Sequence, residues 1–150
     1  MQSTLALRDQ AAKLLAADTT TLAPAMSANK VHLASANFTP SEGLVVGDLT
    51  EATFTGYAAI AAGTGSQGEG FDPGTLDSVI DILPPAGGWK FTVTSATGLP
   101  QTIYGFYLTN NAGTTLYGAA LFDAPIVLNN NGDVIVIDRV YFRLLNGSLQ

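Results

Sequence analysis

Hydrophobic and polar residues alternate along most of the chain beyond its N-terminal segment, a pattern that predicts β-strands. The clearest two-residue period lies in GGWKFTVTSA, where Trp89, Phe91 and Val93 alternate with polar residues and are expected to face the core. Shorter strands are predicted at 29–35 and at 78–83, the second ending at a pair of prolines.

The stretch TEATFTGYAAI, residues 50–60, also alternates and predicts a further strand. One face would carry small and apolar residues and the other would carry threonine and tyrosine. The first face comprises Ala52, Phe54, Gly56, Ala58 and Ile60, and the second comprises Thr53, Thr55 and Tyr57.

Two turns rich in asparagine and glycine predict hairpins in the C-terminal half. NNAG lies between predicted strands at about 102–109 and 114–121. NNNGD precedes a long strand predicted at 133–144, and its Asn131-Gly132 dipeptide is the strongest short hairpin signal in the sequence. Both faces of that last strand are partly apolar, so a central position or coverage by a second subunit is expected.

The N-terminal stretch is the one segment with helical periodicity. Apolar residues recur there at Leu7, Ala11, Leu14 and Leu15, which predicts an amphipathic helix over 3–17. Together with about eight strands and turns rich in glycine and proline, this predicts a mainly β protein, an antiparallel β-sandwich or jelly-roll-like fold with one N-terminal α-helix. The predicted organisation is an N-terminal helical arm, residues 1–27, and a single β-sandwich domain, residues 28–150.

Composition narrows the classes of function. Hydrophobic residues make up 47% of the chain and charged residues only 12%, whereas about 25% charged is usual for soluble domains. Such a charge-poor surface is typical of a protein held in an assembly or exposed outside cells. With six Lys and Arg residues against twelve Asp and Glu, neither nucleic acid nor an anionic membrane is an expected partner. The chain has no cysteine, which excludes disulfides and thiolate metal sites.

A glycine motif and a lone histidine suggest cofactor binding or catalysis, and both are better explained without such a role. GTGSQG at 63–68 fits G-x-G-x-x-G, but Gly70, Pro73 and Gly74 exclude the helix that a dinucleotide site requires at that point. His32 is the only histidine, and alternation places it on the face opposite Val31 and Leu33. A structural or surface role is favoured over a catalytic base, because no nucleophile elbow accompanies it.

Carboxylates and aromatics also offer candidates. Glu69, Asp72 and Asp77 could ligate a hard cation such as Ca²⁺, although solvated loop acids are the favoured interpretation and no cofactor is expected. The aromatic residues favour core or intersubunit packing over a sugar-stacking platform. These residues are Tyr104, Phe106, Tyr107, Tyr117, Tyr141 and Phe142.

Charges within the last predicted strand indicate an interface. Asp138 and Arg139 interrupt an apolar run and need partners, either in a neighbouring subunit or at Glu51 or Asp81 within the chain. The predicted interface residues come from the helix and from this strand. They are Leu7, Ala11, Leu14, Leu15, Arg139, Tyr141 and Arg143.

Residues 29–58, NKVHLASANFTPSEGLVVGDLTEATFTGYA, resemble a recurring arrangement in small virion-associated proteins of tailed bacteriophages. The C-terminal YGFYLTNNAGTTLYGAALFDAPIVLNNNGDVIVID is similar to the same group. The matching positions in the first segment are Asn37, Thr39, Pro40, Asp48, Leu49, Thr50, Glu51, Ala52, Phe54, Gly56, Tyr57 and Ala58.

The resemblance implies a component of the phage particle and no catalytic residues. The expectation is therefore a non-enzymatic capsid decoration or auxiliary protein located in the virion. It would assemble as a homo-oligomer, favoured as a trimer, on the major capsid protein or other virion proteins. The alternative is a tail-fibre or receptor-binding module that recognises carbohydrate.

Overall fold

The computed structural model describes the backbone of residues 2–3, 29–62, 78–82, 84, 86–138, 140–145 and 148–149. Side chains are described for residues 29–62, 84, 86–138 and 140. The described part is mainly β and its strands pair antiparallel throughout. It holds a single 3-10 turn, η1 (Val46–Asp48), and no α-helix.

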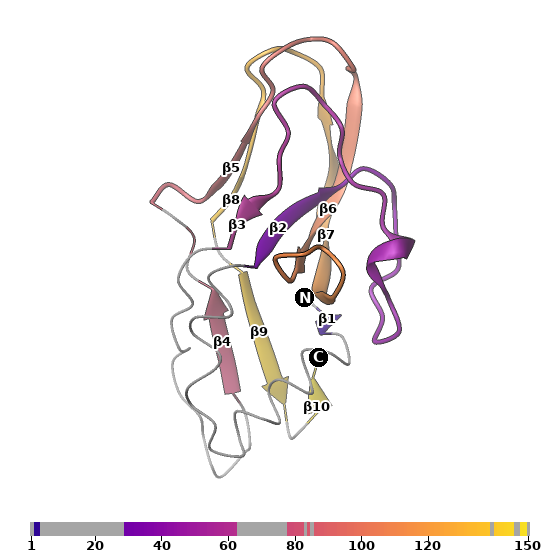
Figure 1. Ribbon diagram of the computed structural model, residues 1–150, viewed down its shortest axis with the longest axis vertical. Coiled ribbons are helices and arrows are strands. Elements are labelled where there is room, and N and C mark those ends of the chain that lie inside the picture. Colours follow the sequence, from indigo (N-terminus) through magenta and orange to yellow (C-terminus); the bar gives the residue numbers. More distant parts are fainter. Residues whose placement is uncertain are drawn as a thin grey trace.

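The strands form three hydrogen-bonded sheets, of which the largest has the order β1-β7-β6-β2-β3. A two-stranded sheet pairs β5 with β8, and a three-stranded sheet has the order β10-β9-β4. The bounds are β1 (Gln2–Ser3), β2 (Lys30–Ala34), β3 (Ile60–Ala61), β4 (Ser78–Ile82), β5 (Trp89–Thr92), β6 (Gln101–Thr109), β7 (Leu116–Leu128), β8 (Val134–Ile137), β9 (Val140–Leu145) and β10 (Ser148–Leu149). Figure 1 shows β2, β3, β5, β6, β7 and β8 in the upper half of the view and β1, β4, β9 and β10 in the lower half.

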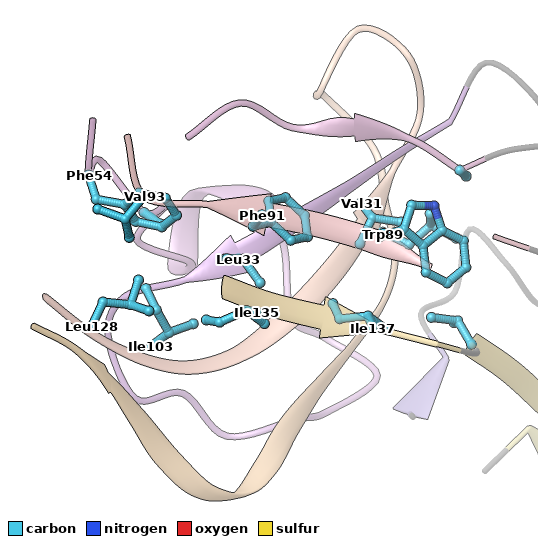
Figure 2. Close-up of a cluster of buried hydrophobic side chains, with 14 of the residues drawn as sticks. Val31, Leu33, Phe54, Trp89, Phe91, Val93, Ile103, Leu128, Ile135 and Ile137 are labelled. Carbon is cyan, nitrogen blue, oxygen red and sulfur yellow. The ribbon is translucent and has the colours of Figure 1, made fainter. Parts of the chain in front are cut away.

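The main hydrophobic core joins the five-stranded and two-stranded sheets. Leu33 and Ile103 come from the first sheet, Trp89 and Phe91 come from β5, and all four are at most 2% exposed (Figure 2). The indole N–H of Trp89 donates a 3.1 Å hydrogen bond to the carbonyl of Ala61, which satisfies its one polar atom inside the core. The apolar face of β5 therefore lies against the core, as the alternation in its sequence predicts.

A second, smaller hydrophobic cluster lies on the other face of the five-stranded sheet. Ala34, Tyr107, Leu116 and Ala119 supply the sheet side of this cluster. The segment 35–50 covers them with the buried Phe38 and the partly buried Leu44, Val46 and Leu49. In Figure 1 this segment, with η1, forms the lobe beside β6 and β7.

The prediction of a strand over residues 50–60 is wrong. Glu51 makes only an isolated bridge to Ala34, and the chain then turns so that the amide of Tyr57 donates to the carbonyl of Phe54 at 3.0 Å. Gly56 has φ +97 at this turn, a conformation that opposes continuation of a strand. The apolar alternation reflects packing instead, because Ala52 and Phe54 are both buried.

The last hairpin prediction is also wrong in its pairing. NNAG does join β6 to β7, as predicted, but the turn containing Asn131 and Gly132 joins β7 to β8, which lie in different sheets. β8 pairs with β5, and the amide of Gly132 donates to the carbonyl of Val93 at 2.9 Å. Within the predicted strand 133–144, β8 ends at Ile137 and β9 begins at Val140, and β9 occupies the centre of its own sheet.

The predicted N-terminal helix lies outside the described residues, except for its first position. Ser3 is in β1, where it pairs with Gly118 and Gln2 pairs with Ala119. The first residues of the predicted arm therefore add a short strand to the edge of the five-stranded sheet.

Candidate functional site

A chain of hydrogen-bonded polar side chains crosses the face of β2 opposite the main core. His32 stands at its centre and is 7% exposed. Its Nδ1 lies 2.7 Å from Oε1 of Glu51, and its Nε2 lies 2.9 Å from Oγ1 of Thr109. The prediction that His32 faces away from Val31 and Leu33 is confirmed, since those two residues lie in the main core.

The side chains that meet around His32 come from separate parts of the chain. Thr109 is the last residue of β6 and pairs with Lys30 across the sheet, beside His32. Glu51 follows the segment 35–50 and is held next to β2 by its bridge to Ala34. Tyr57 ends the turn in which its amide donates to the carbonyl of Phe54. Its hydroxyl donates to Oε1 of Glu51 at 2.7 Å.

The two partners of His32 fit either charge state of the imidazole. An ionised Glu51 only accepts, so Nδ1 carries a proton towards it. With a neutral ring, Nε2 accepts from the hydroxyl of Thr109. With a charged ring, Nε2 donates, and the Thr109 hydroxyl can turn to the carbonyl of Asn110 at 2.9 Å. The site therefore satisfies both ring nitrogens in each protonation state.

The two tyrosines of the site are held in their neutral form. Burial raises the pKa of Tyr57, and its hydrogen bond and proximity to the Glu51 carboxylate raise it further, against an opposing effect of the Leu33 amide. That amide donates to the Tyr57 hydroxyl at 3.2 Å. Burial likewise raises the pKa of Tyr107, and the charge of Glu51 adds to the effect. Both shifts disfavour a second negative charge beside Glu51.

The sequence of hydroxyl, imidazole and carboxylate is the one used by hydrolytic triads, but the exposure of the groups differs. Thr109 is 0% exposed, so its oxygen does not meet a substrate from solvent in this conformation. The side chain of Glu51, by contrast, is 45% exposed. The geometry therefore fits a structural polar clamp, made of His32, Glu51, Thr109 and Tyr57, that joins β2, β6 and the segment ending at Glu51.

Most of the interface residues predicted from sequence lie outside the described residues. These are Leu7, Ala11, Leu14, Leu15 and Arg139. Tyr141 and Arg143 lie on β9, where their backbones pair with Asp81 and Val79 of β4. Glu51, considered as a partner for the charges of the last strand, lies 2.7 Å from His32, and its relation to Arg139 lies outside the described residues.

The glycine motif at 63–68 and the acidic residues Glu69, Asp72 and Asp77 also lie outside the described residues. Among the residues that are described, no group of three or more His, Asp or Glu side chains is placed to hold a metal ion. Within the same part of the chain, no helix has the length and apolar character needed to cross a membrane. No protein-family model, curated protein or solved structure matches the chain.

Proposed function

We propose that this protein is a structural component of a bacteriophage virion, a capsid decoration protein without catalytic activity. The proposal rests on the resemblance of residues 29–58 to virion-associated proteins and on the surface of the β-sheets. Along β7 and along β8, exposed large aliphatic side chains outnumber exposed charged ones. A protein that docks repeatedly onto a lattice gains strength from many modest apolar contacts.

The exposed aliphatic side chains supply the observation that carries the proposal. Ile126 and Val127 on β7 are 36% and 49% exposed, and Val134 and Val136 on β8 are 41% and 44% exposed. The only charged residue of β7 is Asp123. Exposed apolar residues of this kind favour contact with a partner surface over permanent exposure to water.

The finer features of the fold belong to the same proposal. The two sheets that share the main core would be the layers of a jelly-roll-like β-sandwich, and residues 1–27 would form an arm that grips the capsid shell or a sister copy. The short strand β1 supports an arm that engages sheet edges, since it pairs with β7. Copies would associate as trimers on the major capsid protein.

The tyrosines support decoration over the alternative of carbohydrate recognition. A sugar-stacking platform needs exposed rings, whereas Tyr107 and Tyr117 are buried and Tyr57 and Tyr104 are half-buried. These four rings are therefore better explained as packing groups, with a hydrogen-bonding role for Tyr57.

Composition of the native particle tests the proposal. Mass spectrometry of purified virions should find this polypeptide in a fixed ratio to the major capsid protein, and a density map should place it on the shell. Its absence from the particle would contradict the proposal. Binding to a glycan array with no incorporation into particles would favour the carbohydrate-binding alternative.

Variants of the apolar surface test the observation that supports the proposal. The double change Val127→Lys and Val136→Lys should reduce incorporation into particles, because each lysine must be desolvated on docking. Thr39→Lys adds a charge at an exposed position of the segment 35–50 and serves as the matched control. Equal incorporation of the wild type, the double variant and Thr39→Lys would exclude these exposed positions of β7 and β8 from the docking contacts.

A further inference from the structure

Residues 35–50 form a loop whose two ends meet at a narrow neck. The amide of Ser35 donates to the carbonyl of Thr50 at 2.8 Å, and the amide of Ala52 donates to the carbonyl of Leu33 at 3.0 Å. The hydroxyl of Ser35 adds a 3.0 Å hydrogen bond to the carbonyl of Glu51. A compact surface loop with closed ends of this kind is an Ω-loop, a class that is often functional.

The body of this Ω-loop is weakly attached to the sheet. Of residues 35–50, only Phe38 is buried, and Val45 is 56% exposed. The loop nonetheless covers an apolar face made by Ala34, Tyr107 and Leu116. Segments with few buried apolar contacts open at low free energy, while the strands beneath them stay closed.

The polar clamp sits directly beside the neck and closes it from outside the loop. Oε1 of Glu51 accepts from His32 on β2 and from the hydroxyl of Tyr57, each at 2.7 Å. His32 cannot follow Glu51 outward, because its ring is held by Thr109 at 2.9 Å and stacks on Tyr107 at 4.7 Å. Hydrogen bonds to a charged group are about twice as strong as neutral ones, so Glu51 is the strongest polar attachment at the neck.

From these contacts we infer that the Ω-loop opens and closes as a unit, and that Glu51 is the latch that sets how often it opens. Opening breaks the bonds of Glu51 to His32 and Tyr57 together with the neck bonds, and it uncovers the apolar face around Tyr107. The five-stranded sheet keeps its own strand pairing throughout. This inference concerns the fold alone and holds whether or not the protein is a virion component.

Native-state hydrogen exchange of the full chain, followed by NMR, tests the inference in the unmodified protein. The amides of Ser35 and Ala52, whose hydrogen bonds close the neck, should share one level of protection, because one opening exposes both. The amide of Val93, bonded to the carbonyl of Asp133 at 2.9 Å in the body of the fold, should be better protected. Equal protection of Val93 and the loop amides would overturn the inference.

Glu51→Gln tests the latch itself, since it keeps the size of the side chain and removes the charge. Exchange of the Ser35 and Ala52 amides should accelerate roughly ten- to a hundredfold, the range expected for losing hydrogen bonds to a charged group. Val93 should exchange at an unchanged rate. Acceleration of the Ser35, Ala52 and Val93 amides by the same factor, or of none of them, would contradict the role of Glu51.

Two further variants separate the latch from a general effect of charge. Tyr57→Phe removes one of the two side-chain donors to Oε1 and should accelerate the loop amides by a smaller factor than Glu51→Gln. Asp123→Asn removes an exposed carboxylate from β7 and should leave the loop amides unchanged. An Asp123→Asn effect as large as that of Glu51→Gln would show that net charge, and not the latch, controls the loop.

Discussion

The imidazole of His32 lies flat against the ring of Tyr107, with the ring centroids 4.7 Å apart and an angle of 8° between the planes. The two residues face each other on neighbouring strands, since His32 pairs with Tyr107 in the register of β2 and β6. The stack fixes the plane of the imidazole, so that its two nitrogens point along the sheet to Glu51 and Thr109. An aromatic cross-strand pair thus orients the polar clamp.

Tyr107→Leu should destabilise the protein by about 1–3 kcal/mol, because it removes both the stack and part of the second hydrophobic cluster. Tyr107→Phe keeps the ring and should cost less than about 1 kcal/mol. Urea unfolding followed by circular dichroism measures both. If the two variants lost equal stability, the ring would not be the feature that matters.

Alkaline pH should weaken the fold through Tyr57 and Tyr107. Their pKa values are raised in the folded protein, chiefly by burial, while an unfolded tyrosine ionises near its ordinary value of 10.0. Below that pH the folded and the unfolded protein both keep the hydroxyl protons, and the stabilising effect of the two tyrosines is complete. Above it the unfolded chain releases protons that the folded chain keeps, so the free energy of unfolding falls as pH rises.

Absorbance of tyrosinate checks this expectation. Of the five tyrosines in the chain, Tyr57 and Tyr107 should stay neutral until the protein unfolds, whereas all five ionise together in urea. The double variant Tyr57→Phe and Tyr107→Phe should lose that late step. A folded protein in which all five tyrosines titrate near their ordinary pKa would refute the prediction.

Gly105→Ala should destabilise the sheet, because the new Cβ would overlap the carbonyl oxygen of Ala120 and lie 2.9 Å from Cα of Leu121. Relief requires the β6 and β7 backbones to separate, at a cost of about 1–3 kcal/mol or more. Thermal unfolding provides the measurement. Gly43→Ala is the matched control, since its Cβ would have no neighbour within 4 Å, and it should unfold at nearly the wild-type temperature.

Asp133→Asn should loosen the connection between β7 and β8. The Asp133 carboxylate accepts from the amides of Asn130 at 2.9 Å and Asn129 at 2.7 Å, and these bonds lower its pKa below the ordinary value of 3.8. A lowered pKa gives stability that is present above the unfolded value and lost as pH falls through the folded one.

Thermal unfolding at several pH values therefore distinguishes Asp133→Asn from wild type. The variant should melt at a lower temperature near neutral pH, and the difference should shrink as the solution is acidified below pH 3.8. Asp123→Asn, at an exposed carboxylate outside the turn, provides the comparison. A difference that stays constant down to the most acidic pH would contradict the role of the ionised carboxylate.

Strands with strict alternation could be predicted from the sequence, because one buried face is enough to define them. Trp89, Phe91 and Val93 are at most 2% exposed, as their spacing predicts. Residues 50–60 alternate equally well but form a turn, since positive φ at Gly56 outweighs the pattern. Apolar spacing reports which side chains are buried and does not report which backbone groups pair.

The polar clamp could be predicted only at His32. Its partners are remote along the chain, Glu51 by 19 residues and Thr109 by 77, and each belongs to a segment whose pairing the sequence does not specify. Lone threonine and glutamate residues are common in exposed positions, so neither carries a local signal. The placement of His32 on the face opposite Val31 and Leu33 is the one part of the site that the alternation predicts.

Strand β7 carries an irregularity that affects how the sheet can grow. Between the pairs Gly105↔Leu121 and Ile103↔Ile126, β6 has one residue and β7 has four, and the last of these four is Pro125. Among the described residues, the outer edge of β7 is paired only at Gly118 and Ala119, so most of that edge is open. Proline offers no N–H for pairing, and the bulge bends the strand. The open edge of β7 therefore resists unspecific edge-to-edge pairing into fibrils, and it can pair only with a strand whose shape matches the bend.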